Sequence, residues 1–143
     1  MYRMMRRVGF LLDPERVHDI ALRAYARRPG TGCATTPVEV MGLRFPNAVG
    51  LAAGYDKDGV AWRGLARLGF GHIEVGTVTA RPQAGNPRPR VFRLPSERGL
   101  INRMGFPSDG AEAVAARLGT DRPGGVVLGV SIGPNGFHGL DQA

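Results

Sequence analysis

The sequence predicts an α/β fold in which helices precede a parallel sheet. A short apolar run at residues 48–53, a helical pattern at 59–68 and a strand-like pattern at 72–78 follow at the spacing of a strand–helix–strand unit. A further helix and strand, at residues 111–118 and 126–132, repeat that order after a long irregular stretch. Successive strands joined by helices are typical of a parallel sheet.

Two helices are predicted ahead of the sheet. Residues 2–12 carry apolar side chains at helical spacing beside an arginine cluster, which indicates a short amphipathic helix. A second helix begins where Asp13 can cap it and Pro14 occupies its first position, and Pro29-Gly30 ends it. The pattern alone favours a packed helical hairpin with solvated arginines over a membrane role.

The composition is that of one globular domain: 143 residues, 43% hydrophobic and 22% charged. The formal net charge of +7 is concentrated near the N-terminus, which would seek an anionic surface. No apolar run approaches the roughly 20 residues of a membrane span, and no secretory signal precedes Asp13. A nucleic-acid binder is a weaker rival, because the basic residues are not interleaved with aromatic ones. We expect a cytosolic protein that does not bind nucleic acid.

Metal sites and disulfides are not expected. Cys33 is the single cysteine, and His18, His72 and His138 show no ligand spacing. Residues 38–45 alternate apolar and polar side chains around Met41-Gly42, which predicts a hairpin.

Each predicted parallel strand ends in glycine or polar residues, at the edge of the sheet where α/β folds bind ligands. Gly54 would let a ligand approach the backbone, although an ordinary turn glycine is the better interpretation of each segment taken alone. Lys57 is the only lysine, while arginine fills the other 18 basic positions. A compact ammonium can meet a flavin or carboxylate where a guanidinium does not fit. Chance remains an equal explanation of that lysine.

The segment 100–106 lies in a connection longer than usual, which hints at a functional loop. Asn102 and Arg103 could clamp a planar anion, because an amide offers donor and acceptor and a guanidinium matches a carboxylate. The alternative is a surface loop anchored in the core by Ile101, Met104 and Phe106.

Together these residues resemble class 2 (quinone-dependent) dihydroorotate dehydrogenase, over about positions 1–133 and in that family's order and approximate spacing. No single motif is decisive, but their order makes coincidence remote. The motifs are Asp13-Pro14-Glu15-Arg16 with His18, Met41-Gly42-Leu43 with Phe45, Gly50 to Gly54 with Asp56-Lys57, Gly69-Phe70-Gly71, Glu74 with Gly76 to Thr79, Arg81-Pro82-Gln83 with Gly85-Asn86, Phe92-Arg93-Leu94, and Leu100 to Phe106.

The resemblance implies a (β/α)8 TIM barrel with FMN at the carboxyl ends of its strands. A two-helix membrane-associated extension, residues 1–36, would lead quinone to the flavin, and residues 37–143 would form the first barrel strands. The protein would be peripheral, on the cytoplasmic side of the cell membrane. It would oxidise dihydroorotate to orotate in pyrimidine (UMP) biosynthesis: the flavin takes a hydride, a serine base takes a proton, and quinone reoxidises the flavin.

The resemblance also implies roles for individual residues. The positions that match FMN contacts are Ala53, Gly54, Tyr55, Asp56, Lys57, Thr77 and Ser131. The positions that match substrate contacts are Lys57, Asn102, Arg103, Met104, Gly105 and Phe106. No position matches the catalytic serine base. Class 1 dihydroorotate dehydrogenase fits less well, because it lacks the helical extension and Cys33 is misplaced for its cysteine base.

Several features depart from the family. Ser131 stands where the family usually has Asn, Pro134 where it has Lys, and residues 136–143 match nothing in it. Three predicted parallel strands fall short of the eight or so in a barrel of typically ~250 residues. We therefore expect an incomplete barrel that is inactive alone, with a non-catalytic membrane-surface fragment as the alternative.

Overall fold

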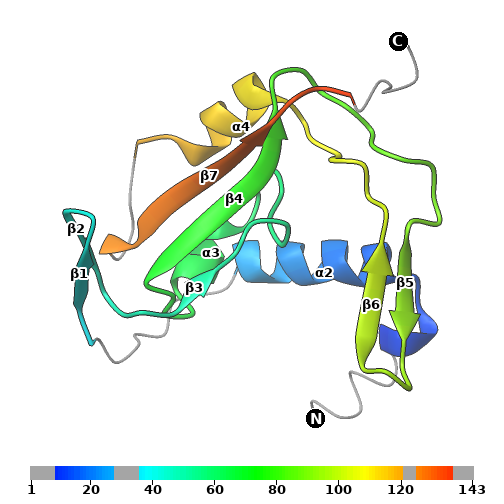
Figure 1. Ribbon diagram of the computed structural model, residues 1–143, viewed down its shortest axis with the longest axis horizontal. Helices are drawn as coiled ribbons and strands as arrows, with labels where there is room; N and C mark the ends of the chain where they lie inside the picture. Colours follow the sequence, from blue (N-terminus) through cyan, green and yellow to red (C-terminus); the bar gives the residue numbers. More distant parts are fainter. Residues whose placement is uncertain (1–8, 28–35, 121–124, 137–143) are drawn as a thin grey trace.

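The computed structural model describes residues 9–27, 36–120 and 125–136, which form an α/β arrangement (Figure 1). The predicted α/β class is confirmed. Most of the first predicted helix, the predicted helix end at Pro29-Gly30, and Cys33 lie outside the described residues.

A parallel sheet lies at the centre, in the strand order β3 (Gly50–Leu51), β4 (His72–Thr79) and β7 (Val127–Gly133). The predicted parallel order is confirmed. The prediction of a strand at residues 48–53 was too long, because only two residues of that run pair with β4. The chain then turns into the loop at Gly54, whose N–H still donates to the carbonyl of Gly76.

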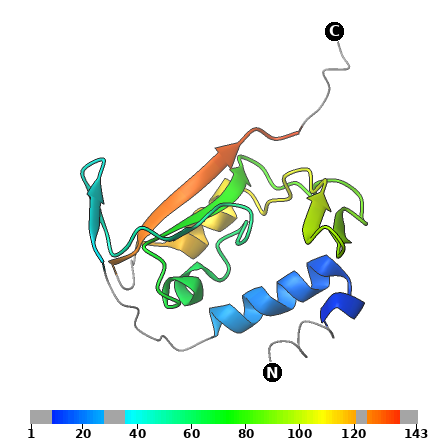
Figure 2. The same cartoon turned by 60° about the horizontal axis from the view of Figure 1, so that its bottom comes forward.

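Helix α2 (Pro14–Ala26) begins as predicted, with the carboxylate of Asp13 accepting the N–H of Arg16 at 3.0 Å. Residues 9–11 just before it are helical. Figure 2 shows α2 running beneath the sheet, on the side where α3 lies. Its buried side chain Leu22 joins the core there.

Helix α3 (Trp62–Ala66) is shorter than the predicted 59–68. Gly59 has a φ of +67°, which an α-helix excludes, so residues 59–61 form a turn before the helix. Helix α4 (Ala111–Leu118) matches its prediction. Both helices pack against β4, and the core consists mainly of side chains from these three elements, including Trp62, Leu65, Ile73, Val75 and Val114.

Two antiparallel hairpins flank the sheet. β1 (Val38–Val40) and β2 (Leu43–Phe45) form the predicted hairpin around Met41 and Gly42, both of which have positive φ. β5 (Val91–Leu94) and β6 (Gly99–Asn102) form a second hairpin that the sequence did not predict. It lies near the first turns of α2, away from β1 and β2 (Figure 1).

No helix in the described ranges is long and apolar enough to cross a membrane. Within the same ranges, no three or more His, Cys, Asp or Glu side chains gather where they could hold a metal ion.

Candidate functional site

A cleft of about 1220 Å³ lies between α2, the carboxyl ends of β3 and β4, and the β5–β6 hairpin with the loop that follows it. This is at least the size of a typical ligand pocket, roughly 300–1,000 Å³. Most of the predicted site residues line it: Gly54, Tyr55, Asp56, Lys57, Thr77, Asn102, Arg103, Met104, Gly105 and Phe106. Segments from three separate parts of the chain therefore meet at one cleft.

The segment after β3 presents a backbone surface and one ammonium to the cleft. Gly54 has a φ of +99°, and a Cβ built on it would meet no atom within 4 Å, so a ligand can approach this backbone closely. The ammonium of Lys57 donates a hydrogen bond to the carbonyl of Gly54. Burial lowers the pKa of Lys57, and the neighbouring Asp58 opposes that change.

Asp56 is engaged inside the protein. It is 1% exposed, and its carboxylate accepts the N–H groups of Val60 at 2.9 Å and Ala61 at 2.8 Å. Burial raises the pKa of Asp56, and these two hydrogen bonds oppose the rise. The side chain therefore fixes the turn into α3, and a ligand would meet other atoms of this segment.

Thr77 and Ser131 bring two hydroxyls together at the ends of β4 and β7. Their Oγ1 and Oγ atoms lie 3.1 Å apart, and either can donate the hydrogen bond. Thr77 lines the cleft, whereas Ser131 and Ala53 are outside its lining. Ser131 is thus placed to orient the Thr77 hydroxyl.

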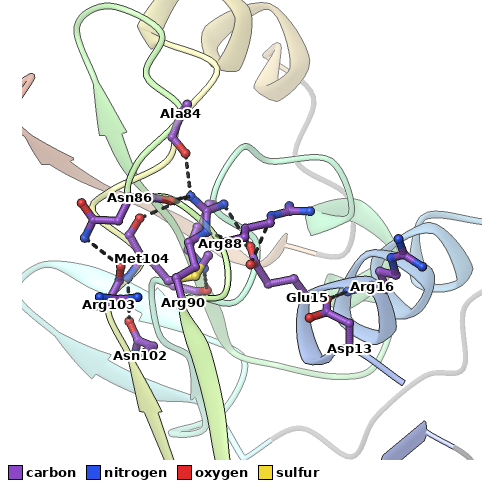
Figure 3. A network of polar contacts seen from close by, with 12 residues as sticks. Asp13, Glu15, Arg16, Ala84, Asn86, Arg88, Arg90, Asn102, Arg103 and Met104 are labelled. Atoms are coloured by element: carbon purple, nitrogen blue, oxygen red, sulfur yellow. Dashed lines mark hydrogen bonds and ion pairs between the residues drawn. The ribbon is translucent and has the colours of Figure 1, made fainter. Parts of the chain in front are cut away.

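The loop 102–106, which begins at the last residue of β6, is held through its carbonyl groups (Figure 3). Asn86 donates from Nδ2 to the carbonyl of Arg103 at 2.8 Å and from its backbone to that of Met104 at 2.9 Å. Gln83 donates from Nε2 to the carbonyl of Phe106 at 2.7 Å. Apolar anchoring was the alternative interpretation of this loop, and it is wrong for Phe106 and the adjacent Ile101, which are 42% and 54% exposed.

The two predicted clamp residues make local contacts. Asn102 accepts the N–H of Met104 on its Oδ1 at 3.4 Å. Arg103 donates to the carbonyl of Pro89 at 3.2 Å, and its guanidinium carbon lies 5.9 Å from the centre of the Phe92 ring. Both side chains are exposed at the cleft and carry donors that an anion could meet.

Sequence reasoning assigned no site role to two further side chains that line the cleft. The ring of His18 on α2 lies 4.8 Å from that of Tyr55, edge to face, and burial together with the nearby Lys57 charge lowers the pKa of His18. Arg90 is 6% exposed and bonded to Glu15 of α2. Glu15 and His18 belong to a motif of the resemblance, but no local pattern marks Arg90 as buried.

Comparison with known proteins settles the family. The family model for dihydroorotate dehydrogenase matches residues 35–141, three quarters of the chain. The chain belongs to the dihydroorotate dehydrogenase family. Within this family its curated relatives carry the name dihydroorotate dehydrogenase (quinone), which confirms the resemblance to class 2. One from Aromatoleum aromaticum is 49% identical over all of this chain and 42% of its own length, and one from Nocardioides is 56% identical over 85% of this chain and 38% of its own.

Solved structures of the family have the same fold. The crystal structure of the Eimeria tenella dihydroorotate dehydrogenase in complex with ferulenol is 40% identical, with a TM-score of 0.77 over 86% of this chain and 36% of that one. The ligand-free form has a TM-score of 0.76. The chain thus spans about two fifths of the length of the curated relatives it matches.

Proposed function

We propose that this chain contributes the N-terminal part of a quinone-dependent dihydroorotate dehydrogenase of pyrimidine (UMP) biosynthesis. The enzyme oxidises dihydroorotate to orotate with FMN and passes the electrons to a quinone. One observation carries this proposal: Lys57, Thr77 and the loop 102–106 come from distant parts of the sequence and line one cleft. We further propose that β3, β4 and β7 are the first strands of a (β/α)8 barrel.

The described residues fit a flavin. Open space over Gly54 leaves its backbone accessible to a planar ring, and the Thr77 hydroxyl, paired with Ser131, offers a polar contact beside it. Lys57 supplies a positive charge at the same edge. When bound, FMN supplies the two-electron redox chemistry that joins dihydroorotate oxidation to quinone reduction.

Orotate is a planar anion with amide groups in its ring, and dihydroorotate is the same anion with the ring's carbon–carbon double bond reduced. Lys57, which lines the cleft, can meet the carboxylate as a point charge. Asn102 offers an amide that donates and accepts, which matches the ring amides. These residues bind and orient substrate, and no residue of this chain is assigned as the base that removes the proton.

NMR spectroscopy of the ¹⁵N-labelled chain, titrated with FMN and with orotate, tests this proposal. We expect the amide signals of Gly54, Lys57, Thr77 and residues 102–106 to shift, and Lys57→Met to weaken orotate binding about tenfold by removing a partly buried ion pair. The control, Arg44→Gln, alters an exposed side chain of β2 outside the cleft lining and should bind as the parent does. Shifts confined to other residues, or equal binding by Lys57→Met, would contradict the assignment.

We also propose peripheral attachment to the cytoplasmic face of the cell membrane through the helical N-terminal part. Phe10, Leu11 and Ile20 are 51%, 86% and 61% exposed there, in a region rich in arginine. Sedimentation with anionic lipid vesicles should show binding that weakens at high salt. Leu11→Glu should reduce it several-fold, since an apolar anchor becomes an anion. Met41→Glu, at a site 84% exposed in the distant β1–β2 hairpin, should not, and equal effects of both would refute this membrane face.

A further inference from the structure

A buried ion pair connects Glu15 of α2 to Arg90, which lies just before β5 and 75 positions later in the sequence. Arg90 donates from Nε to one carboxylate oxygen of Glu15 at 3.0 Å, and its Nη2 lies 2.9 Å from the same oxygen. The two side chains are only 7% and 9% exposed. The second oxygen of Glu15 lies 3.2 Å from Nε of Arg88, whose side chain is 59% exposed. One carboxylate therefore meets a buried arginine and a surface arginine.

The remaining guanidinium nitrogen of Arg90 faces backbone carbonyl groups (Figure 3). Nη1 donates to those of Ala84 at 2.6 Å and Asn86 at 3.0 Å, with a longer contact to that of Met104 at 3.5 Å. The carbonyl of Arg90 itself accepts the N–H of Arg103 at 2.8 Å. Arg90 thus joins the first turn of α2 to two segments, residues 84–86 and the loop 102–106.

Only an arginine can make this set of contacts. The planar guanidinium points its donors in fixed, divergent directions, whereas a lysine would concentrate three donors at one point. Glu15 is well placed to receive them, because it lies in the first turn of α2, where the helix dipole favours a carboxylate. Because Arg90 is buried, the loss of Glu15 would leave its charge without a partner, which is unfavourable.

The loop has little apolar support of its own. Phe106 is 42% exposed and Met104 is only half-buried, and Leu100 and Ile101 of β6, just before the loop, are 57% and 54% exposed. Its shape must therefore come from polar contacts, and those of Arg90 reach it from the side of α2. Of these contacts, the one to the carbonyl of Met104 reaches the loop directly, and those to Ala84 and Asn86 hold the segment from which Asn86 donates to the loop.

We propose that Arg90, oriented by Glu15, is a positioning residue that sets the loop 102–106 for substrate. This inference rests on the proposed function for the ligand, dihydroorotate or orotate, and on the contacts alone for the loop. Arg90 acts through the backbone of Arg103 and Met104 and does not itself carry out chemistry. By the same contacts, α2 and the substrate loop move as one unit.

The test compares the 143-residue chain with Arg90→Met, Arg90→Lys, Glu15→Gln and, as a control, Arg88→Gln. Residue-resolved amide exchange by NMR reports the loop through Asn86 and Arg103, whose N–H groups donate within this network. The β4–β7 ladder, at Val75 for instance, reports the core. Orotate affinity is measured on the same samples.

Arg90→Met should accelerate exchange at Asn86 and Arg103 about tenfold or more while the ladder changes little, and weaken orotate binding by a similar factor. Arg90→Lys should not restore either property, and Glu15→Gln should show a smaller effect in the same direction. Arg88→Gln should match the parent's amide exchange at Asn86 and Arg103 within about twofold, because exposed ion pairs contribute little.

Two results would overturn the positioning role. One is an equal acceleration at loop and ladder, which indicates a general loss of stability. The other is unchanged loop exchange in Arg90→Met while the parent binds orotate. If the parent binds no orotate, yet Arg90→Met accelerates loop exchange as expected, the ligand of the proposed function is wrong. The positioning of the loop by Arg90 then stands.

Discussion

Replacing Gly64 by alanine tests how α2 is held beneath the sheet. Gly64 lies in α3, and a Cβ built on it would come within 1.8 Å of the carbonyl oxygen of Tyr25 in α2. The obstacle is backbone, so no side-chain rotation can relieve it. To reach ordinary contact at 3.4 Å, the two helices must separate by about 1.6 Å.

The expected sign of the effect separates this packing from simple helix propensity. Without a neighbour, alanine would stabilise a helix interior by roughly 0.5–1 kcal/mol relative to glycine. Overpacking costs about 1–3 kcal/mol, and displacement of α2 also exposes part of Leu22, whose full burial contributes roughly 1.5–3 kcal/mol. Leu22 is 8% exposed and belongs to the core. We expect Gly64→Ala to lower the free energy of unfolding by about 2 kcal/mol.

Urea denaturation followed by the fluorescence of Trp62, the only tryptophan, measures this difference. Gly129→Ala in β7 is the matched control, since a Cβ there meets its nearest atom at 3.6 Å, an ordinary contact. We expect that control to leave stability unchanged or to raise it by up to about 1 kcal/mol, the usual gain on replacing a strand glycine by alanine. An unchanged or raised midpoint for Gly64→Ala would refute the close approach of α2 and α3.

Three further substitutions probe the turn before α3, the cleft wall and the end of α4. Asp56→Asn should lower the free energy of unfolding in urea by about 1–3 kcal/mol. Each carboxylate oxygen of Asp56 accepts one buried N–H group, whereas an amide has one oxygen and would turn its NH2 toward the other N–H. Burial lowers the pKa of His18 below 6.5, so as pH falls the unfolded chain is protonated at His18 before the folded chain is. The free energy of unfolding should therefore decline as pH falls from about 6.5 to the folded pKa. A pH series of urea midpoints should lose that part of the slope in His18→Gln, and an identical slope would contradict the shift. Arg63→Met removes hydrogen bonds of 2.8 and 3.0 Å to the carbonyls of Arg117 and Leu118, so amide exchange in α4 should accelerate, and unchanged exchange would exclude this capping role.

The elements that could be predicted are those with a local cause. Asp13 and Pro14 mark the start of α2. The apolar residues that predicted β4 from the sequence are the ones that its structure buries. The β5–β6 hairpin was missed because its strands are only four residues long and β6 is exposed throughout, so no alternation of apolar and polar residues reveals it.

Much of the candidate site could be found from sequence for a different reason. Lys57 comes shortly after a parallel strand, where α/β folds bind ligands. The loop 102–106 lies in the unusually long connection between β4 and α4. Family resemblance then supplied the roles. Asp56 matches a flavin-contacting segment, and its carboxylate also accepts the N–H groups of Val60 and Ala61, a contact that the resemblance did not supply.

The ion pair of Glu15 and Arg90 could not be predicted, and the reason is physical. Arginine fills 18 positions of this chain, and each has the same local signature of an exposed, solvated side chain. Burial of one guanidinium is decided only when α2, the segment 84–86 and the loop come together, since each supplies an acceptor that the others lack. For the same reason the substitution of Arg90 should affect all of these segments, because its contacts exist only when they are assembled. A buried arginine that bridges separate segments beside a cleft is therefore a better guide to how the loop is set than any motif within the loop itself.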